Sequence, residues 1–388
     1  MEIKFSKAED KIREVAKEFA EKEAAPIAEE IDKEAKYPVE TFKKMVSCGF
    51  TGIGVPVEYG GSGGDDITKC IVVEEIAKKC AATAGILSIH GIFGQCILNF
   101  GTEEQKKEYL PKVTNGGMHG AFALTEPNAG SDAGAAKTRA IKQGEDYIIN
   151  GTKCFITGGA HADYTIVFAL TDPSKGLKGL SAIIVPKDAP GFSIGKTEDK
   201  MGIRASETSE LIFDNCRVPQ KNLVGKEGLG FKIAMIMLDG ARIGVAAQAL
   251  GIAEGALDES IKYMHERVQF GAPIANLQGL QWYIAEMATK NECAKWMVYR
   301  AASLKAQGLP HSKEAAMAKL NASENARFVT NLALQIHGGY GYMKDYPLER
   351  MAAAFDLCSQ CRCLKTSVTF PSIFISVTFI GLIDEFSG

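Results

Sequence analysis

The sequence of 388 residues lacks an excess of charge of either sign. Its 44 lysines and arginines are balanced by 47 aspartates and glutamates, and the formal net charge is -3. A nucleic-acid-binding protein needs a basic surface, and this balance excludes a global field of that kind. A charged ligand must therefore be bound in a local pocket.

A membrane-spanning segment in the tail and disulfide-like cysteine spacing are also missing. The apolar stretch VTFPSIFISVTFIGLI at 368–383 is shorter than the roughly 20 residues of a membrane-spanning helix, and it contains Pro371. The ten cysteines follow no regular pattern, and CSQCRC at 358–363 offers only three thiols without a nearby histidine. The start, MEIKFSKAED, lacks the features of a signal peptide. These absences predict a cytoplasmic protein with reduced thiols, no membrane segment and no metal.

Motifs that would settle a reaction class are scarce. The sequence has no HExxH zinc-protease motif, no GxxxxGK[ST] phosphate loop and no GxGxxG between a strand and a helix. The glycine-rich YGGSGGDD at 59–66 lacks the lysine of a phosphate loop. It therefore favours a structural turn over nucleotide binding.

The first third of the chain has helical patterns. Ser6 and Glu9 form a capping-box pattern before a run of apolar residues at helical spacing. A second helix is predicted between Pro38 and Gly49. We therefore expect an α-helical N-terminal domain over residues 1–118.

The middle of the chain has strand patterns. Two short apolar runs flank Asn150 and Gly151, a dipeptide typical of tight hairpin turns. LSAIIVP and SELIFDNCRVP continue in the same style. The pattern predicts an antiparallel β domain over 119–225.

Helical patterns return after residue 226 in three long segments that predict an antiparallel bundle over 226–351. The predicted fold class is therefore α+β, with helices, a β domain and then a helical bundle. Residues 352–388 are expected to be an atypical tail.

Five separated blocks closely resemble the acyl-CoA dehydrogenases. In chain order they are ALTEPNAGSD at 123–132, KMGIRASETSELIFDNCRVP at 200–219, GARIGVAAQALG at 240–251, ERVQFGAPI at 266–274 and QIHGGYGYMKDYPLER at 335–350. Five blocks in the right order are far more specific than one glycine motif. RIGVAAQALGIAE is most similar to the short-chain, butyryl-type bacterial members.

The resemblance implies an FAD between the β domain and the C-terminal bundle. It assigns cofactor contacts to Phe122, Leu124, Thr125, Ser131, Phe155, Ile156, Thr157, Arg267, Phe270, Gln278, Gln335, Gly338 and Gly339. In the family, the positions matched by Arg267, Phe270 and Gln278 contact the cofactor of a neighbouring subunit. The resemblance therefore also implies a homotetramer built as a dimer of dimers.

The implied reaction is the α,β-dehydrogenation of a short-chain acyl-CoA to a trans-2-enoyl-CoA, with an electron-transfer flavoprotein as partner. The resemblance places the substrate against Ser131, Asp239, Gly240, Ala241 and Arg242. Without the resemblance, Asp239 and Arg242 are better interpreted as an ion pair on the helix surface.

The catalytic glutamate of the family has no counterpart. An ungapped match places it at Arg362, and the alternative location on an earlier helix holds Ala241. An arginine, with a pKa above about 12, cannot accept the α-proton. Three explanations of the tail remain open: a frameshift, fusion or assembly error; a genuine divergent ending; or another acid that folds back into the site. Two alternative functions also remain, an inactive flavin or acyl-CoA binding protein and an acyl-CoA oxidase.

Overall fold

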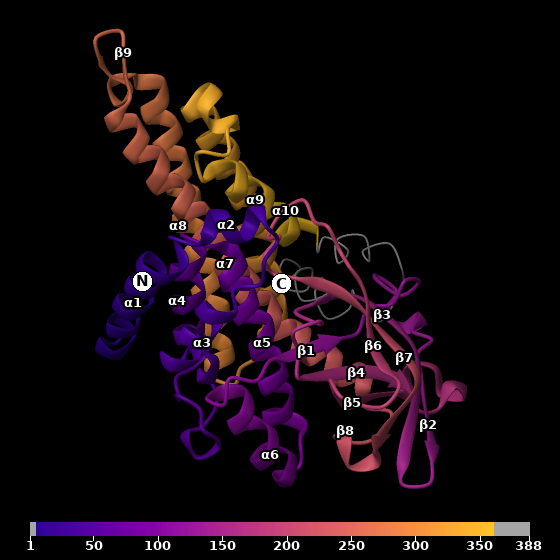
Figure 1. The fold of residues 1–388 in the computed structure, drawn as a ribbon. Coiled ribbons are helices and arrows are strands. Elements are labelled where there is room, and N and C mark those ends of the chain that lie inside the picture. Colours follow the sequence, from indigo (N-terminus) through magenta and orange to yellow (C-terminus); the bar gives the residue numbers. More distant parts are fainter. Residues whose placement is uncertain (1–4, 361–388) are drawn as a thin grey trace, which may run out of the picture.

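The computed structural model describes residues 5–360 as a helical N-terminal part, a β-sheet and a long helical bundle (Figure 1). The N-terminal helices are α1 (Lys7–Phe19), α2 (Ala28–Lys33), α3 (Val39–Ser47), α4 (Asp66–Ala77), α5 (Ala81–Phe100) and α6 (Glu103–Thr114). The sheet contains β1 (Gly120–Ala123), β2 (Arg139–Gln143), β3 (Asp146–Thr157), β4 (Tyr164–Leu170), β5 (Leu180–Pro186), β6 (Phe192–Thr197), β7 (Thr208–Pro219) and β8 (Leu223–Val224). The C-terminal part contains α7 (Gly230–Glu266), β9 (Val268–Gln269), β10 (Ala272–Pro273), α8 (Gln278–Ala306), α9 (Ser312–His337) and α10 (Leu348–Gln360).

The local helix signals of the sequence are confirmed. Ser6 Oγ accepts from Glu9 N at 3.2 Å, and Ser6 N donates to the Glu9 carboxylate at 2.5 Å, which is the predicted capping box. α3 is followed by Gly49, whose φ of 74° ends the helix in the left-handed region that glycine adopts without strain.

The sheet is mixed, which corrects the prediction of a purely antiparallel domain. Its strand order is β6-β7-β3-β2-β4-β5-β8, with β1 paired to β4. Most neighbours are antiparallel, but β4 pairs in parallel with both β1 and β2. β1 and β4 are separated in the chain by the β2–β3 hairpin, yet they lie side by side in the sheet and run in the same direction.

The predicted hairpin turn at Asn150 and Gly151 is wrong, because β3 runs straight through this dipeptide. The β2–β3 turn lies at Gly144 (φ 62°) and Glu145 instead. At Gly151 the backbone of β3 approaches Thr138 closely, since a Cβ there would lie 2.8 Å from the Thr138 Cα. The pairing register between β3 and β7 also shifts at this point.

The longest described helix of the bundle is α7, which has 37 residues and is about 55 Å long. Its first turns carry Ile233, Ala234 and Met237 into the core cluster that holds β4 and β5 side chains. α5 and α7 have the length and hydropathy of a membrane span, but 72% and 56% of their apolar windows are buried inside the fold, as in core helices.

The connections between the three parts lie at 115–119 and 225–229, and we propose 118 and 225 as domain boundaries. The predicted start of an atypical tail at 352 falls inside α10. Ala353 and Ala354 are buried in the bundle, because the helical pattern continues beyond Met351.

α7 crosses α4 closely at Gly251, where a Cβ would lie 2.3 Å from the Glu74 carbonyl oxygen. We expect Gly251→Ala to lower the free energy of unfolding by about 1–3 kcal/mol, because two helix backbones must move apart. Gly94→Ala on α5 is the matched control, since its Cβ would lie 3.9 Å from Val113, and it should leave the stability unchanged or raise it. Equal effects in urea titrations would refute this account of the crossing.

Candidate active site

The ends of β1 and β3 form one face of the candidate site. Phe122, Leu124 and Thr125 lie at the end of β1 and in the segment after it. Cys154 N on β3 donates to Thr125 O at 3.0 Å, so the structure joins this segment to the stretch that contains Phe155 and Thr157. We call these two joined segments, 122–125 and 154–157, the platform.

A β-bulge shapes the platform. Lys153 pairs with Leu211 and Ile156 with Ser209, so β3 has one residue more than β7 over this interval. Phe155 has a φ of 57° and is 63% exposed, whereas the Ile156 side chain is buried in the sheet core. A ligand on the platform would therefore meet the Phe155 ring but only the backbone of Ile156.

The predicted substrate residues at 239–242 lie in the first half of α7. The Asp239 carboxylate accepts from Arg242 Nη1 and, at 2.5 Å, from Ser312 Oγ. Ala241 packs against the same core cluster as Leu124. Arg242 Nε is buried without a partner among the described residues, which leaves one donor for a ligand. The pair predicted for the helix surface is thus partly buried, and its printed contact outside α7 goes to Ser312 at the start of α9.

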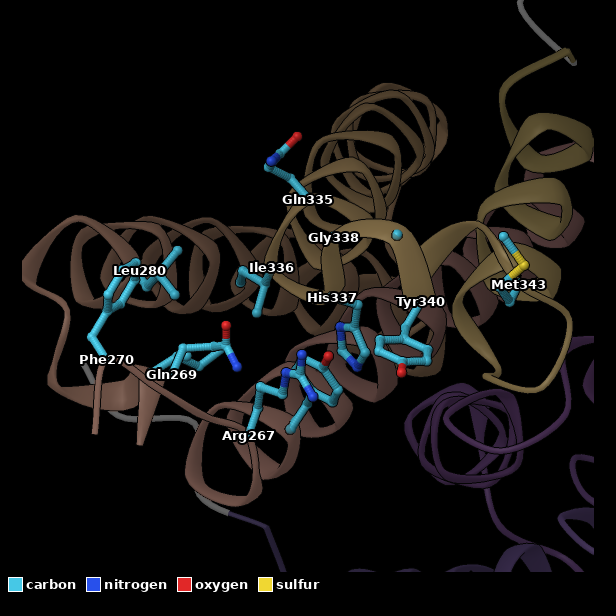
Figure 2. Close-up of a pocket in the computed structure, with 13 residues that line it drawn as sticks. Arg267, Gln269, Phe270, Leu280, Gln335, Ile336, His337, Gly338, Tyr340 and Met343 are labelled. Atoms are coloured by element: carbon cyan, nitrogen blue, oxygen red, sulfur yellow. The ribbon is translucent and has the colours of Figure 1, made fainter. Parts of the chain in front are cut away.

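A cavity of about 660 Å³ lies at the other end of α7 (Figure 2). Five of the predicted cofactor residues line it, namely Arg267, Phe270, Gln335, Gly338 and Gly339. Figure 2 shows Arg267 and Gln269 facing Ile336 and His337 across the cavity, whereas the Gln335 side chain points away. Gln278 lies at the start of α8, exposed and outside the lining.

The chemistry of this cavity suits an anionic ligand. Arg267 makes no ion pair with any residue in the described part of the chain, and its guanidinium lies 5.5 Å from the centre of the Tyr340 ring. Gly338 has a φ of 58° and open space at its Cβ position, so a ligand can approach the backbone there. Unpaired arginines with nearby backbone groups are typical of phosphate sites. Phe270 is 94% exposed with a φ of 54°, and such strained, exposed aromatic residues are common at ligand sites.

One chain does not bring the platform and the cavity together. Arg242 and Arg267 are 25 residues apart on α7, which is about 38 Å of helix. Figure 1 shows β9 at the tip of the bundle, away from the sheet. We call the platform side and the cavity the two candidate half-sites of the chain.

Of the two positions that the resemblance gave for a catalytic base, only Ala241 lies in the described part of the chain. Ala241 has only a methyl group, and the nearby Asp239 carboxylate is already bound to Arg242 and Ser312. Arg362 lies outside the described residues, as does most of the predicted tail.

The sequence did not point to a histidine cluster beside Thr157, in which His90 is buried and His119 is partly buried. His90, His119 and Tyr37 line a space of about 10 Å³, roughly the volume of one water molecule, together with Thr157. Gly120 N donates to His90 Nδ1 at 3.2 Å, and Tyr37 Oη lies 3.0 Å from His119 Nδ1. These side chains come from three distant segments, so no local pattern could reveal the cluster.

Burial lowers the pKa of His90 to about 4 and that of His119 to about 3, because a charged imidazole would lose its hydration. Both histidines are therefore neutral near pH 7. The cluster joins α5 and the segment before β1, so it connects the N-terminal helices to the sheet next to the platform.

Three family models match most of the chain. They are the acyl-CoA dehydrogenase N-terminal domain at 6–117, the middle domain at 121–216 and the C-terminal domain at 228–357. Among curated proteins, an acryloyl-CoA reductase (NADH) from Anaerotignum propionicum is 65% identical over 90% of both chains. A short-chain specific acyl-CoA dehydrogenase from Clostridium acetobutylicum is 51% identical over 90% of this chain and 93% of its own.

Solved structures give the same result. A structure described as the electron transferring flavoprotein of Acidaminococcus fermentans matches with a TM-score of 0.92 and 48% identity, over 96% of this chain and 100% of its own. Butyryl-CoA dehydrogenase from Megasphaera elsdenii matches with a TM-score of 0.91 and 44% identity, over 92% and 95%. An acyl-CoA dehydrogenase complexed with FAD from Bacillus anthracis matches with a TM-score of 0.86 and 34% identity, over 92% and 64%.

The buried His90 and the partly buried His119 make the free energy of unfolding depend on pH. An unfolded histidine has a pKa of about 6.5, so between that pH and the lower folded pKa the unfolded chain binds more protons, and stability falls as the pH falls. From pH 7 to pH 5 we expect each histidine to reduce the free energy of unfolding by about 2 kcal/mol. His90→Gln and His119→Gln should each remove that share of the loss, as measured by urea titrations at both pH values. His265→Gln, at an exposed histidine, is the control and should keep the full wild-type loss of stability between pH 7 and pH 5. If His90→Gln and His119→Gln keep that full loss as well, the assignment is contradicted.

Proposed function

Because the chain belongs to the acyl-CoA dehydrogenase family, as the sequence resemblance predicted, we propose that it is an FAD-dependent oxidoreductase of short-chain acyl-CoA thioesters. The fold class predicted from the sequence is confirmed as well. The observation that carries the proposal is that Ala241 of α7 packs against the same core cluster as Leu124 of the platform, which supports a thioester site close to a flavin face.

The residues present fit FAD. When bound, FAD supplies the acceptor for a hydride from the β-carbon of the thioester. Thr125 and Thr157 offer a hydroxyl each at the ends of the platform strands, and the half-exposed Phe155 ring offers an apolar face. At the other half-site the unpaired Arg267 and the open Gly338 suit the charged nucleotide part.

The cofactor site is proposed to be shared between subunits. A single FAD cannot span the roughly 38 Å of helix between Arg242 and Arg267, so a second chain has to supply the cavity. This requires at least a dimer, and the proposed assembly is a homotetramer. The exposed Phe270 then becomes an interface residue, which accounts for a large aromatic side chain at 94% exposure.

The substrate thioester is proposed to lie against Asp239, Gly240 and Arg242. Arg242 Nε is the buried donor without a partner among the described residues, and a thioester or pantetheine carbonyl would satisfy it. Ser131 is exposed in the loop between β1 and β2 and is assigned to the same ligand.

Proton abstraction is the step that this chain supports poorly. Neither Ala241 nor Arg362 can accept the α-proton, so we propose that substrate binds while dehydrogenation is slow. Hydride transfer to the flavin is coupled to loss of that proton, so both halves of the reaction are affected.

The relative named acryloyl-CoA reductase (NADH) favours a second candidate, the reduction of a short 2-enoyl-CoA at the same site. The similarity to a structure described as an electron transferring flavoprotein supports a flavoprotein as redox partner. A cytoplasmic location is proposed with both candidates.

The cofactor proposal predicts that the purified protein is yellow and contains FAD. Arg267→Ala should weaken FAD binding by about 10-fold or more, because the charge-assisted contact to the nucleotide is lost. Lys290→Ala on α8 removes an exposed cation outside the cavity and is the control. Fluorescence titration of the apoprotein measures both constants. A wild-type protein that stays colourless with added FAD would refute the proposal.

The proposed lack of a base predicts little flavin bleaching when butyryl-CoA is added without oxygen. Loss of a general base typically removes ~10²- to 10⁴-fold of the rate. Ala241→Glu should restore part of the bleaching, and Ala241→Gln, of similar size without a proton acceptor, should not. Arg362→Glu alone should recover little, since a misplacement of about 1 Å can lower the rate ~10²-fold. Rapid bleaching by the unmodified chain would show that another acid acts as the base.

A further inference from the structure

A fully buried ion pair lies directly behind the platform. Lys153 is 0% exposed and Glu126 is 7% exposed, and Lys153 Nζ lies 2.7 Å from Glu126 Oε1. The same ammonium donates to Leu124 O at 2.9 Å. Lysine is rarely buried to this degree unless its charge is compensated, so the pair is a specific feature of this region.

The lysine contacts the residues on both sides of Thr125. Leu124 accepts through its carbonyl and Glu126 through its carboxylate. Thr125 itself accepts from Cys154 N, the residue that follows Lys153. The position of Thr125 is therefore fixed from three directions by two consecutive residues of β3.

The glutamate fixes the loop that follows. Its Oε2 accepts from Lys137 N at 2.7 Å and its Oε1 from Thr138 N at 3.0 Å. These contacts close the loop between Glu126 and Thr138, which contains Ser131, and they hold the start of β2. Burial disfavours the charged form of both partners, yet the Lys153 ammonium lowers the pKa of Glu126, so the carboxylate stays ionised near neutral pH.

The bulge of β3 begins at the same lysine. The residue that the bulge turns outward, Phe155, comes two positions after Lys153, and Thr157 follows it. Both segments of the platform are thus attached to one buried ammonium. Two apolar side chains of similar volume would fill the space as stably, but they would make none of these directed contacts.

We propose that Lys153 and Glu126 are the positioning pair of the flavin site, which sets the placement of Thr125 relative to Phe155 and Thr157. The inference rests on the proposed FAD site, and it assigns a role to two residues that lie behind the ligand-facing surface. Neither residue is a catalytic residue, because both act through the platform.

The test uses the full-length double variant Lys153→Met with Glu126→Gln, which removes both charges and leaves neither alone in the core. The matched control is Lys295→Met with Glu254→Gln, a partly buried pair 3.2 Å apart between α8 and α7. In that control Lys78 keeps its contact with Glu75.

We expect the platform variant to weaken FAD binding by roughly 10- to 100-fold, the range that loss of supporting hydrogen bonds costs at metal sites. The visible circular dichroism of the remaining bound flavin should change shape, because its surroundings are displaced. The control pair should change neither quantity, although it lowers thermal stability. Unchanged affinity and an unchanged flavin spectrum in the platform variant would overturn the inference.

A readout without flavin separates this inference from the proposed function. Amide hydrogen exchange of the flavin-free protein should accelerate in segments 124–138 and 153–157 of the platform variant, and not in the control pair. If the wild-type protein binds no FAD, the proposed function fails, and these exchange rates still decide whether the pair orders the platform. If the double variant does not fold, Glu126→Asp keeps both charges and shortens the reach to Lys137 and Thr138. Glu126→Asp should accelerate hydrogen exchange in the same two segments to a smaller degree. Exchange rates in Glu126→Asp equal to those of the wild-type protein would overturn the inference.

Discussion

The length of α7 is the constraint on which the rest of the structure depends. A straight helix of 37 residues has its first turns in the sheet core and its last turn at the tip of the bundle. Arg242 and Arg267 are functional candidates on the same helix, yet about 38 Å of helix lies between them. Because an α-helix cannot fold back on itself, the proposed FAD site is complete only if a second chain supplies one of the two half-sites. In that proposal, the requirement for assembly follows from the length of one helix.

The parts of the fold that the sequence could predict are those whose signals are local. Helix signals are local, so the Ser6 capping box, the stop at Gly49 and the long segments of the bundle were all recognisable. Strand pairing is not local. Asn150 and Gly151 have the composition of a turn, but the pairing of β3 with β7 on one side and β2 on the other extends the strand through them. The parallel pairs of β4 likewise depend on the order in which the chain visits the sheet.

Prediction of the site had a similar limit. The resemblance proposed Thr125, Arg267 and Gly338 because each lies inside a matched block, and Thr157 because the short stretch at 155–157 matches a flavin-facing strand of the family. Residues that act through others were not identifiable in this way. Lys153 and Glu126 are 27 positions apart and meet only when β3 lies beside the segment that follows β1. His90 meets His119 only when α5 packs on the sheet. Buried polar contacts of this kind follow from tertiary packing, which no local pattern encodes.

The distribution of these residues along the chain separates ligand binding from proton abstraction. Every proposed contact to flavin or thioester lies between Phe122 and Gly339, inside the described fold and inside the segments matched by the family models. The match to the C-terminal model ends at residue 357, five positions before Arg362. The polar groups proposed to hold a thioester, Asp239 and Arg242, contact each other and Ser312, all inside the segment matched by the C-terminal family model. In the proposed function, ligand binding therefore depends on residues of the matched domains, whereas proton abstraction needs a carboxylate that neither Ala241 nor Arg362 supplies.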